Sequence, residues 1–213
     1  MLDKSIDYKN VIMKIESDKI NDIESPMLPD GFSFRFFRSG DEEHWARIEA
    51  SVLEFDSADA ARAYFERAYL PHKKNLEKRC IFALNRDGLP IATANSWFAD
   101  SKELGYQASL HWVAVCPDYQ GLGIGRAITK QALINFQSLE PNKPVWLHTQ
   151  TWSHPAIRLY HNLGFSIMKT ERLANNNTKD GNPKIYRNDF YEAIEVLRDV
   201  MDDKDVNELI STK

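Results

Sequence analysis

The chain has few cysteines and no long hydrophobic run, and both features limit what it can be. Only Cys80 and Cys116 occur among 213 residues, so neither a disulfide framework nor a zinc site made by cysteines alone is expected. A reducing, cytoplasmic location follows as the default. No apolar stretch approaches the length of a transmembrane helix, and the N-terminus carries acids where a signal peptide carries bases. We therefore expect a cytoplasmic protein with no membrane partner.

The chain also has no excess of positive charge. It carries 27 Lys and Arg against 31 Asp and Glu, which gives a net charge of −4. A nucleic-acid-binding surface usually makes its domain basic, so we expect no nucleic-acid partner. The six histidines show no metal-ligand spacing, and no metal is expected. At 213 residues the chain suits one domain with an ample core or one domain plus appendages, and 43% apolar residues are ordinary for a soluble globular protein.

Glycine is scarce too, but three of the nine glycines fall within five residues, at Gly121, Gly123 and Gly125. They follow an apolar strand at 110–115 and lead directly into a helix. Free backbone N–H groups at the positive end of a helix are typical of phosphate binding. A P-loop needs lysine after its last glycine, and a dinucleotide fingerprint needs a third glycine. Arg126 stands at both positions, so both motifs are excluded.

What remains is the pattern Gln/Arg-x-x-Gly-x-Gly/Ala, carried by Gln120, Gly123 and Gly125. It resembles motif A of the GNAT family of N-acetyltransferases. A second segment, Ser153–Phe165, resembles the family pattern Asn-x-x-Ala-x-x-Leu-Tyr-x-x-x-Gly-Phe, with Ser153 in place of the asparagine. The two matches occur in the family's order and together cover about residues 109–170. The chain is therefore similar to the GNAT family over its central part.

The resemblance implies an α/β fold with an α+β mixed sheet, the GNAT acyl-CoA N-acyltransferase fold. Its central sheet is mostly antiparallel and twisted, with a splayed pair formed by the fourth and fifth strands and with flanking helices. We expect a polar N-terminal extension at 1–30 that packs late or partly frays. The GNAT domain then spans 31–187, and a C-terminal helical extension at 188–213 packs on the same domain.

The order of strands can be read from alternating and apolar runs bounded by turns. The first expected strand is 32–37, and the closing hairpin is expected from a strand at 166–170, a polar loop and a strand at 184–186. Periodic apolar residues predict a helix from Phe190 to Met201. This helix would either cap the sheet edge or join a homodimer interface, and the sequence leaves both open.

The resemblance also implies acetyl-CoA as the acyl donor. In the family the glycine-rich loop grips the pyrophosphate, and the pantetheine arm enters between the splayed strands. Main-chain groups at Val113 and Val115 would pair with that arm, and a backbone N–H would bind the thioester oxygen. The expected donor-binding residues are Val113, Ala114, Val115, Gln120, Gly121, Leu122, Gly123, Ile124, Gly125, Arg126, Ser153, Ala156 and Tyr160.

Tyr160 matches the family tyrosine proposed as general acid toward the departing thiolate. The general base is less clear. His148 stands where some relatives carry a glutamate, and His111 lies on the preceding sheet strand. An imidazole suits a base at neutral pH, but each histidine is equally well explained as a buried structural residue, and some family members use only a water chain.

The leading hypothesis is an N-acetyltransferase that moves acetyl from acetyl-CoA to a primary amine by direct attack in a ternary complex. The acceptor is a small molecule or a peptide. Two alternatives stay open: a weakly catalytic CoA-binding sensor or regulatory module, and an enzyme that acetylates the N-terminus of a ribosomal protein. Some of the tryptophans at 97, 112, 146 and 152 could reach the acceptor pocket and favour an apolar or cationic amine.

Overall fold

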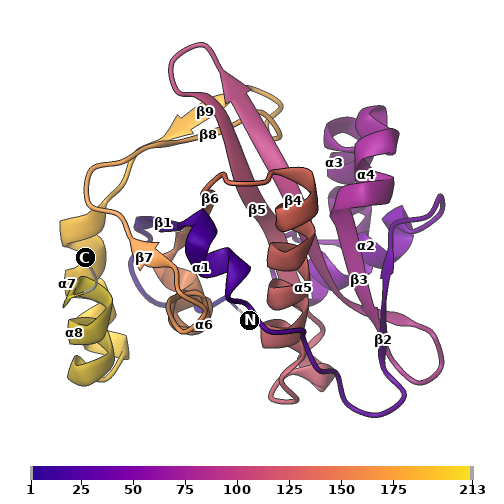
Figure 1. Cartoon of the computed structure of the whole chain (residues 1–213), viewed down its shortest axis with the longest axis horizontal. Coiled ribbons are helices and arrows are strands. Elements are labelled where there is room, and N and C mark those ends of the chain that lie inside the picture. Colours follow the sequence, from indigo (N-terminus) through magenta and orange to yellow (C-terminus); the bar gives the residue numbers. More distant parts are fainter. Residues whose placement is uncertain (1, 212–213) are drawn as a thin grey trace.

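The computed structural model describes residues 2–211, which form one seven-stranded sheet, one small hairpin and surrounding helices (Figure 1). In chain order the helices and strands are β1 (Asn10–Ile15), α1 (Ser17–Asn21), β2 (Ser33–Phe36), α2 (Glu42–Ser51), α3 (Ala58–Ala68), α4 (Lys73–Arg79), β3 (Cys80–Leu84), β4 (Pro90–Ser101), β5 (Gly105–Val115), α5 (Ile124–Leu139), β6 (Val145–Gln150), α6 (His154–His161), β7 (Ser166–Ile167), β8 (Leu173–Asn175), β9 (Lys184–Tyr186), α7 (Phe190–Val200) and α8 (Asp203–Ser211).

The sheet runs in the order β2-β3-β4-β5-β6-β1-β7 and is antiparallel except where β5 meets β6. Strands β2 to β5 form a meander. Its β3–β4 turn is held by Asn85, whose side-chain oxygen accepts hydrogen bonds from the N–H groups of Asp87 and Leu89. Helix α5 packs on one face of the meander, while α2, α3 and α4 cover the other face (Figure 1). The predicted mixed α/β fold is confirmed.

Strands β5 and β6 separate soon after they meet. They pair in parallel only at Ala108 with Val145 and at Ser109 with Trp146. Further along β5 its register with β4 shifts, and Trp112 adopts a φ of +53°, a value that is rare for a bulky residue. Such a bulge bends its strand. The far half of β5 therefore offers unpaired backbone groups toward β6, as expected for a splayed pair.

The N-terminal region does not behave as an extension that packs late or frays, and this expectation is wrong for residues 10–15. They form β1, which lies between β6 and β7 and pairs antiparallel with both. Val11, Ile12, Met13 and Ile15 are all 0% exposed. Because β1 is covered on both faces, its short apolar run is what a central strand requires.

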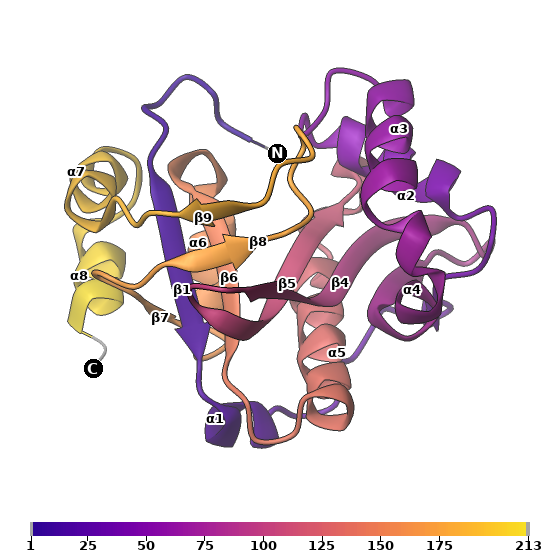
Figure 2. The same cartoon turned by 90° about the horizontal axis from the view of Figure 1, so that it is seen from above.

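The closing hairpin also differs from the expectation. Residues 166–167 form β7, which pairs with β1 rather than with 184–186. The partner of β9 is β8, and these two make a separate hairpin across the end of the sheet near β6 and β1 (Figure 2). Beyond it the chain forms two helices, α7 and α8, which pack beside β1, α6 and β7. The expected helix ends at Val200.

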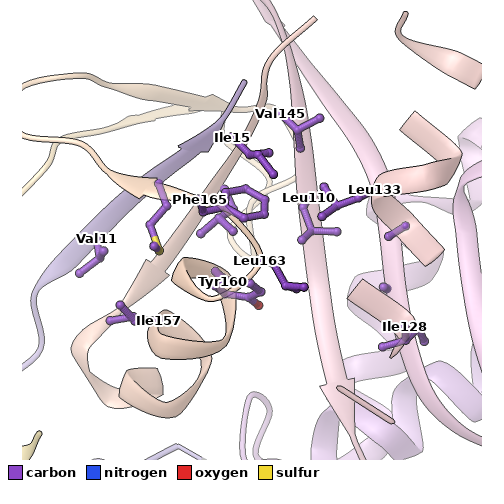
Figure 3. Close-up of a cluster of buried hydrophobic side chains, with 14 of the residues drawn as sticks. Val11, Ile15, Leu110, Ile128, Leu133, Val145, Ile157, Tyr160, Leu163 and Phe165 are labelled. Atoms are coloured by element: carbon purple, nitrogen blue, oxygen red, sulfur yellow. The ribbon is translucent and has the colours of Figure 1, made fainter. Parts of the chain in front are cut away.

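The core beneath the splayed strands holds α6 in place. Ile157 and Tyr160 from α6 pack with Phe165, Leu110 and the buried side of β1 (Figure 3). Gly164, at φ +99°, ends the turn after α6, where a left-handed conformation favours glycine. This packing fixes the position of Tyr160 relative to β5.

Candidate active site

Two cavities meet where β5 and β6 part. The glycine-rich loop lines one of about 410 Å³, here called the loop cavity. The β8–β9 hairpin lines the other, of about 470 Å³, here called the hairpin cavity. The residues that line both are Leu2, Glu54, Val113, Ser153, Ala156 and Tyr160. A group held at this junction is therefore accessible to molecules in either cavity.

The loop cavity collects nearly all of the residues expected to bind the donor. The exceptions are Leu122, which is 52% exposed on the loop, and Ile124, which is buried in the core beneath α5. The predicted residues that line the loop cavity are Val113, Ala114, Val115, Gln120, Gly121, Gly123, Gly125, Arg126, Ser153, Ala156 and Tyr160.

Gly121 and Gly123 give the loop its shape. Both have a φ of +78°, and Gly123 is the residue that precedes the first turn of α5. A Cβ atom at either position would meet nothing within 4 Å, so it would project into the space that a ligand would use. The Gln120 side chain ties the loop to β5, because its Nε2 donates to the Val115 carbonyl at 2.9 Å. The N–H groups at the positive end of α5 suit a phosphate.

Ser153 precedes α6, but its hydroxyl does not cap the helix. Its Oγ instead lies 3.2 Å from Nε2 of Gln150 and accepts a hydrogen bond from it. The serine that replaces the family's asparagine therefore links the end of β6 to the junction of the two cavities.

Tyr160 lies at this junction with little access to solvent, being 7% exposed. Burial raises the pKa of its hydroxyl above the ordinary value, and the nearby charges of Glu49 and Glu54 raise it further. The hydroxyl forms no hydrogen bond with residues 2–211, and Figure 3 shows the ring between α6 and the strand that carries Leu110. The Tyr160 hydroxyl is thus protonated at neutral pH, and its hydrogen is available to a molecule bound at the cavity junction.

His148 lines the hairpin cavity and is held from both sides. Its ring stacks on Tyr186 at 3.8 Å between centroids, and its Nε2 lies 2.8 Å from Oδ1 of Asn10. The Asn10 amide donates its Nδ2 hydrogen to Asp189, so its oxygen faces His148 and the imidazole hydrogen is on Nε2. Burial lowers the pKa of His148 to about 4. The ring is therefore neutral at pH 7, with its lone pair on Nδ1.

His111 also lines the hairpin cavity, but its Nδ1 is already engaged. The Tyr69 hydroxyl lies 3.0 Å from that nitrogen and accepts a hydrogen bond from Trp112 Nε1 at 2.9 Å. Its own hydrogen is then free for His111 Nδ1, which leaves His111 with a hydrogen on Nε2. Burial, together with the nearby charge of His148, lowers the pKa of His111 to about 3. The ring nitrogen that is not hydrogen-bonded is thus a proton acceptor in His148 (Nδ1) and a proton donor in His111 (Nε2–H).

The hairpin cavity contains functional groups that the sequence analysis missed. Glu49 on α2 and Glu54 after it are acidic wall residues, and Lys179 reaches in from the loop between β8 and β9. Glu49 could have been found, because it shares an otherwise apolar helix face with Trp45, Ile48 and Val52. The residues after α2 and in the loop carry no such signal.

The N-terminal segment completes the wall. Asp3 N–H donates to the Trp152 carbonyl at 2.9 Å, and the Trp152 indole donates to the Ile6 carbonyl at 2.8 Å. These bonds hold the segment against the start of α6, where Leu2 lines both cavities. Trp112 and Trp152 line the hairpin cavity, whereas Trp97 is buried in the core and hydrogen-bonded to Asn177.

Among residues 2–211, no group of three or more His, Cys, Asp or Glu side chains is arranged to hold a metal ion. Within the same residues, no helix has the length and hydrophobicity needed to cross a membrane.

The sequence of this chain matches a known protein family. Residues 41–165 match the model of the acetyltransferase (GNAT) family, which is more than half of the chain. The chain belongs to the GNAT family. The matched region contains α2, strands β3 to β5 of the meander, the glycine-rich loop and α6, and therefore most of both cavities. Acetyltransferases of the GNAT family use acetyl-CoA.

The curated relatives resemble much of the chain at low identity. A mycothiol acetyltransferase of Actinosynnema mirum is 29% identical over 149 residues, covering 70% of this chain and 49% of the relative. A mycothiol acetyltransferase of Acidothermus cellulolyticus is 25% identical over 178 residues, covering 78% and 54% respectively. The chain thus spans about half the length of the curated relatives it matches.

Solved structures agree on the fold. A GCN5-related N-acetyltransferase from Sphaerobacter thermophilus superposes with a TM-score of 0.58 at 19% identity, over 76% of this chain and 49% of that one. A tandem GNAT protein from the clavulanic acid biosynthesis pathway gives 0.55 at 18% identity, over 77% and 51%. At these identities the likeness shows a GNAT fold.

Proposed function

We propose that this protein is an N-acetyltransferase that transfers acetyl from acetyl-CoA to a primary amine of a small molecule or peptide. The observation that carries the proposal is the meeting of two cavities at Val113 and Tyr160, one of them lined by the glycine-rich loop. Donor and acceptor would enter from different sides and react at the junction, in one ternary complex.

Most of the groups that would bind acetyl-CoA belong to the main chain. The N–H groups of the loop at Gly121 and Gly123 would bind the pyrophosphate, with Arg126 adding a charge-assisted contact. Val113 and Val115 lie on the part of β5 that has no partner strand on its β6 side, so the backbone groups that face this side would pair with the pantetheine arm. An N–H here would also stabilise the oxyanion that forms on the thioester oxygen.

The transfer needs one proton acceptor and one proton donor. The amine nitrogen attacks the thioester carbon, and its C–N bond forms as the C–S bond breaks. We assign proton removal from the nitrogen to Nδ1 of His148, because that lone pair is free while the corresponding atom of His111 accepts from Tyr69. Tyr160 would protonate the departing thiolate, since its raised pKa keeps its hydrogen in place at neutral pH.

The test is acetyl-CoA-dependent thiol release over a panel of amines, together with calorimetric titration of acetyl-CoA. The name of the curated relatives makes the acceptor of mycothiol acetyltransferases one member of the panel; ribosomal-protein N-terminal peptides form another. Turnover with any amine supports the proposal. Tight acetyl-CoA binding without turnover over the whole panel would favour a CoA-binding sensor instead, and no binding would contradict both.

A further inference from the structure

Glu49 is a buried carboxyl without a partner. It lies on α2 and is 1% exposed, and its Oε1 is buried without a hydrogen bond. Leaving a carboxyl oxygen buried and unpaired is costly, so such groups in native proteins call for an explanation. Glu49 also lines the hairpin cavity. The missing partner can therefore come from a molecule in that cavity.

The other acidic groups of the hairpin cavity are already paired. Lys179 Nζ lies 3.3 Å from Oε2 of Glu54, and Lys184 Nζ lies 2.6 Å from Oδ2 of Asp180. Among the carboxyl groups that line the cavity, only Glu49 has no ion pair within residues 2–211. A positively charged group of a bound molecule could form the ion pair that Glu49 lacks.

Lys179, which lines the same cavity, already places an ammonium group over aromatic rings. Lys179 Nζ lies 4.3 Å from the centroid of the Phe55 ring and 5.4 Å from that of Trp112. Trp112 in turn packs edge-on against Trp45, one turn of α2 before Glu49. Aromatic faces attract cations. The carboxyl of Glu49 and these aromatic rings therefore both favour a positively charged ligand.

We propose that Glu49 binds the positively charged amino group of the acceptor, so that the acceptor is a cationic amine that enters as its ammonium ion. This assignment rests on the proposed acetyl transfer and names the acceptor class for the same site. Glu49 binds the ammonium ion, and its carboxylate takes one proton from that ion before attack, which leaves a neutral amine as the nucleophile; the second proton of the nitrogen still goes to His148, and Tyr160 still protonates the thiolate. In this role the carboxylate and the ammonium form a charge-assisted hydrogen bond in a site screened from water.

The charged state of Glu49 gives the proposal a measurable signature. Burial raises the pKa of Glu49 well above its usual value; the charge of Glu54 raises it further, and that of Lys179 lowers it. The other titratable groups that line the hairpin cavity are Lys4, Tyr8, His111, His148, Tyr160, Asp180, Lys184 and Tyr186. In the absence of a cation the carboxyl favours its protonated form, so binding an ammonium ion releases a proton from Glu49.

The first experiment compares butylammonium with 1-butanol, which has the same chain and no charge. Binding is followed by the indole N–H signals in NMR, and proton release by calorimetry in buffers of different ionisation enthalpy. The variants are Glu49→Gln, which keeps the shape, and Glu43→Gln, the same change on the exposed side of α2. We expect wild type and Glu43→Gln to bind butylammonium more tightly than 1-butanol and to release protons on binding it. Glu49→Gln should bind butylammonium at least about tenfold more weakly and release no proton.

Equal binding of the two probes by wild type, including no binding of either, would contradict the inference, and so would a Glu49→Gln variant that still prefers the cation. Because this readout needs no turnover, its failure is distinct from failure of the proposed acetyl transfer. Where an amine is acetylated, Glu49→Gln should raise its KM about tenfold and leave acetyl-CoA affinity unchanged. An unchanged KM for a cationic amine would also contradict the assignment.

Discussion

Nε2 of His148 donates to Oδ1 of Asn10 across 2.8 Å, although 138 residues separate the two. The same Asn10 amide donates to Asp189 at 2.8 Å, which lies just before α7. Three distant parts of the chain, β1, β6 and the start of α7, therefore fix one imidazole. Because Asn10 fixes the position of the hydrogen on the ring, it is a positioning residue for the proposed base.

The first prediction follows from this contact. Asn10→Ala should lower kcat about tenfold or more, because the His148 ring loses the acceptor that holds its hydrogen on Nε2. In a His148→Gln background the same change should have little further effect on kcat. Steady-state kinetics of the four proteins in this double-mutant cycle make the check, with Asn207→Ala on the exposed side of α8 as the control. Additive losses would mean that Asn10 acts on stability rather than through His148.

The second prediction concerns the proposed acid. Tyr160→Phe should reduce kcat by about 10²-fold while acetyl-CoA affinity stays nearly unchanged, because only the hydroxyl that protonates the thiolate is removed. Thiol release and calorimetric titration measure the two quantities. Tyr191→Phe is the matched control, since Tyr191 is 70% exposed on α7. Full activity of the Tyr160 variant would exclude it as the acid.

The third prediction separates backbone strain from donor binding. Gly123 and Gly40 both have positive φ, at +78° and +99°, and a Cβ at either meets nothing within 4 Å. Alanine at either position should therefore cost about 1–2 kcal/mol of stability. Only Gly123→Ala should also weaken acetyl-CoA binding, because its Cβ would enter the loop cavity. Chemical denaturation and calorimetry measure the two effects; equal acetyl-CoA affinities would argue against phosphate binding at the loop.

The fourth prediction is an acid-labile fold. The pKa values of His111 and His148 are lowered to about 3 and about 4 in the folded protein, from 6.5. Between pH 6.5 and 4 the unfolded chain binds protons that the folded chain does not, so stability falls as the pH falls. The loss should be on the order of a few kcal/mol.

Urea unfolding at a series of pH values between 6.5 and 4 measures this loss. His148→Gln should flatten the dependence, whereas His72→Gln, a change at an exposed position, should leave it as in wild type. A wild-type stability that stays constant over this range would mean that the imidazoles take up protons in the folded state.

The sequence was sufficient where a motif ties residue type to local geometry. Most residues of the loop from Gln120 to Arg126 line the same cavity as Tyr160, and the family spacing was enough to single out both segments; their role in donor binding stays a prediction. Glu49 was missed for a different reason. Its importance comes from lacking a partner after folding, and that depends on which side chains from β5 and the hairpin approach α2.

The strand pairing of residues 10–15 could not be predicted from the sequence for a related reason. The three apolar residues at 11–13 in a polar region show that a strand is possible, but its partners, β6 and β7, are set by contacts at least 130 residues away. The closing hairpin was misassigned as a result, because β1 takes the place beside β7. Trp112 gave no warning of its positive φ either, since bulky residues rarely adopt it.

The place of β1 between β6 and β7 also bears on how the protein is made. On the ribosome β1 emerges before its two partner strands, which are synthesised at least 130 residues later. During that interval an apolar segment that is fully covered in the native state has no sheet to join, and is available to chaperones or to other nascent chains. The part of the sheet that contains β6 and β7 thus has to be built around a strand synthesised at least 130 residues earlier. Co-translational folding of this sheet therefore depends on β1 staying unpaired and accessible until β6 and β7 emerge.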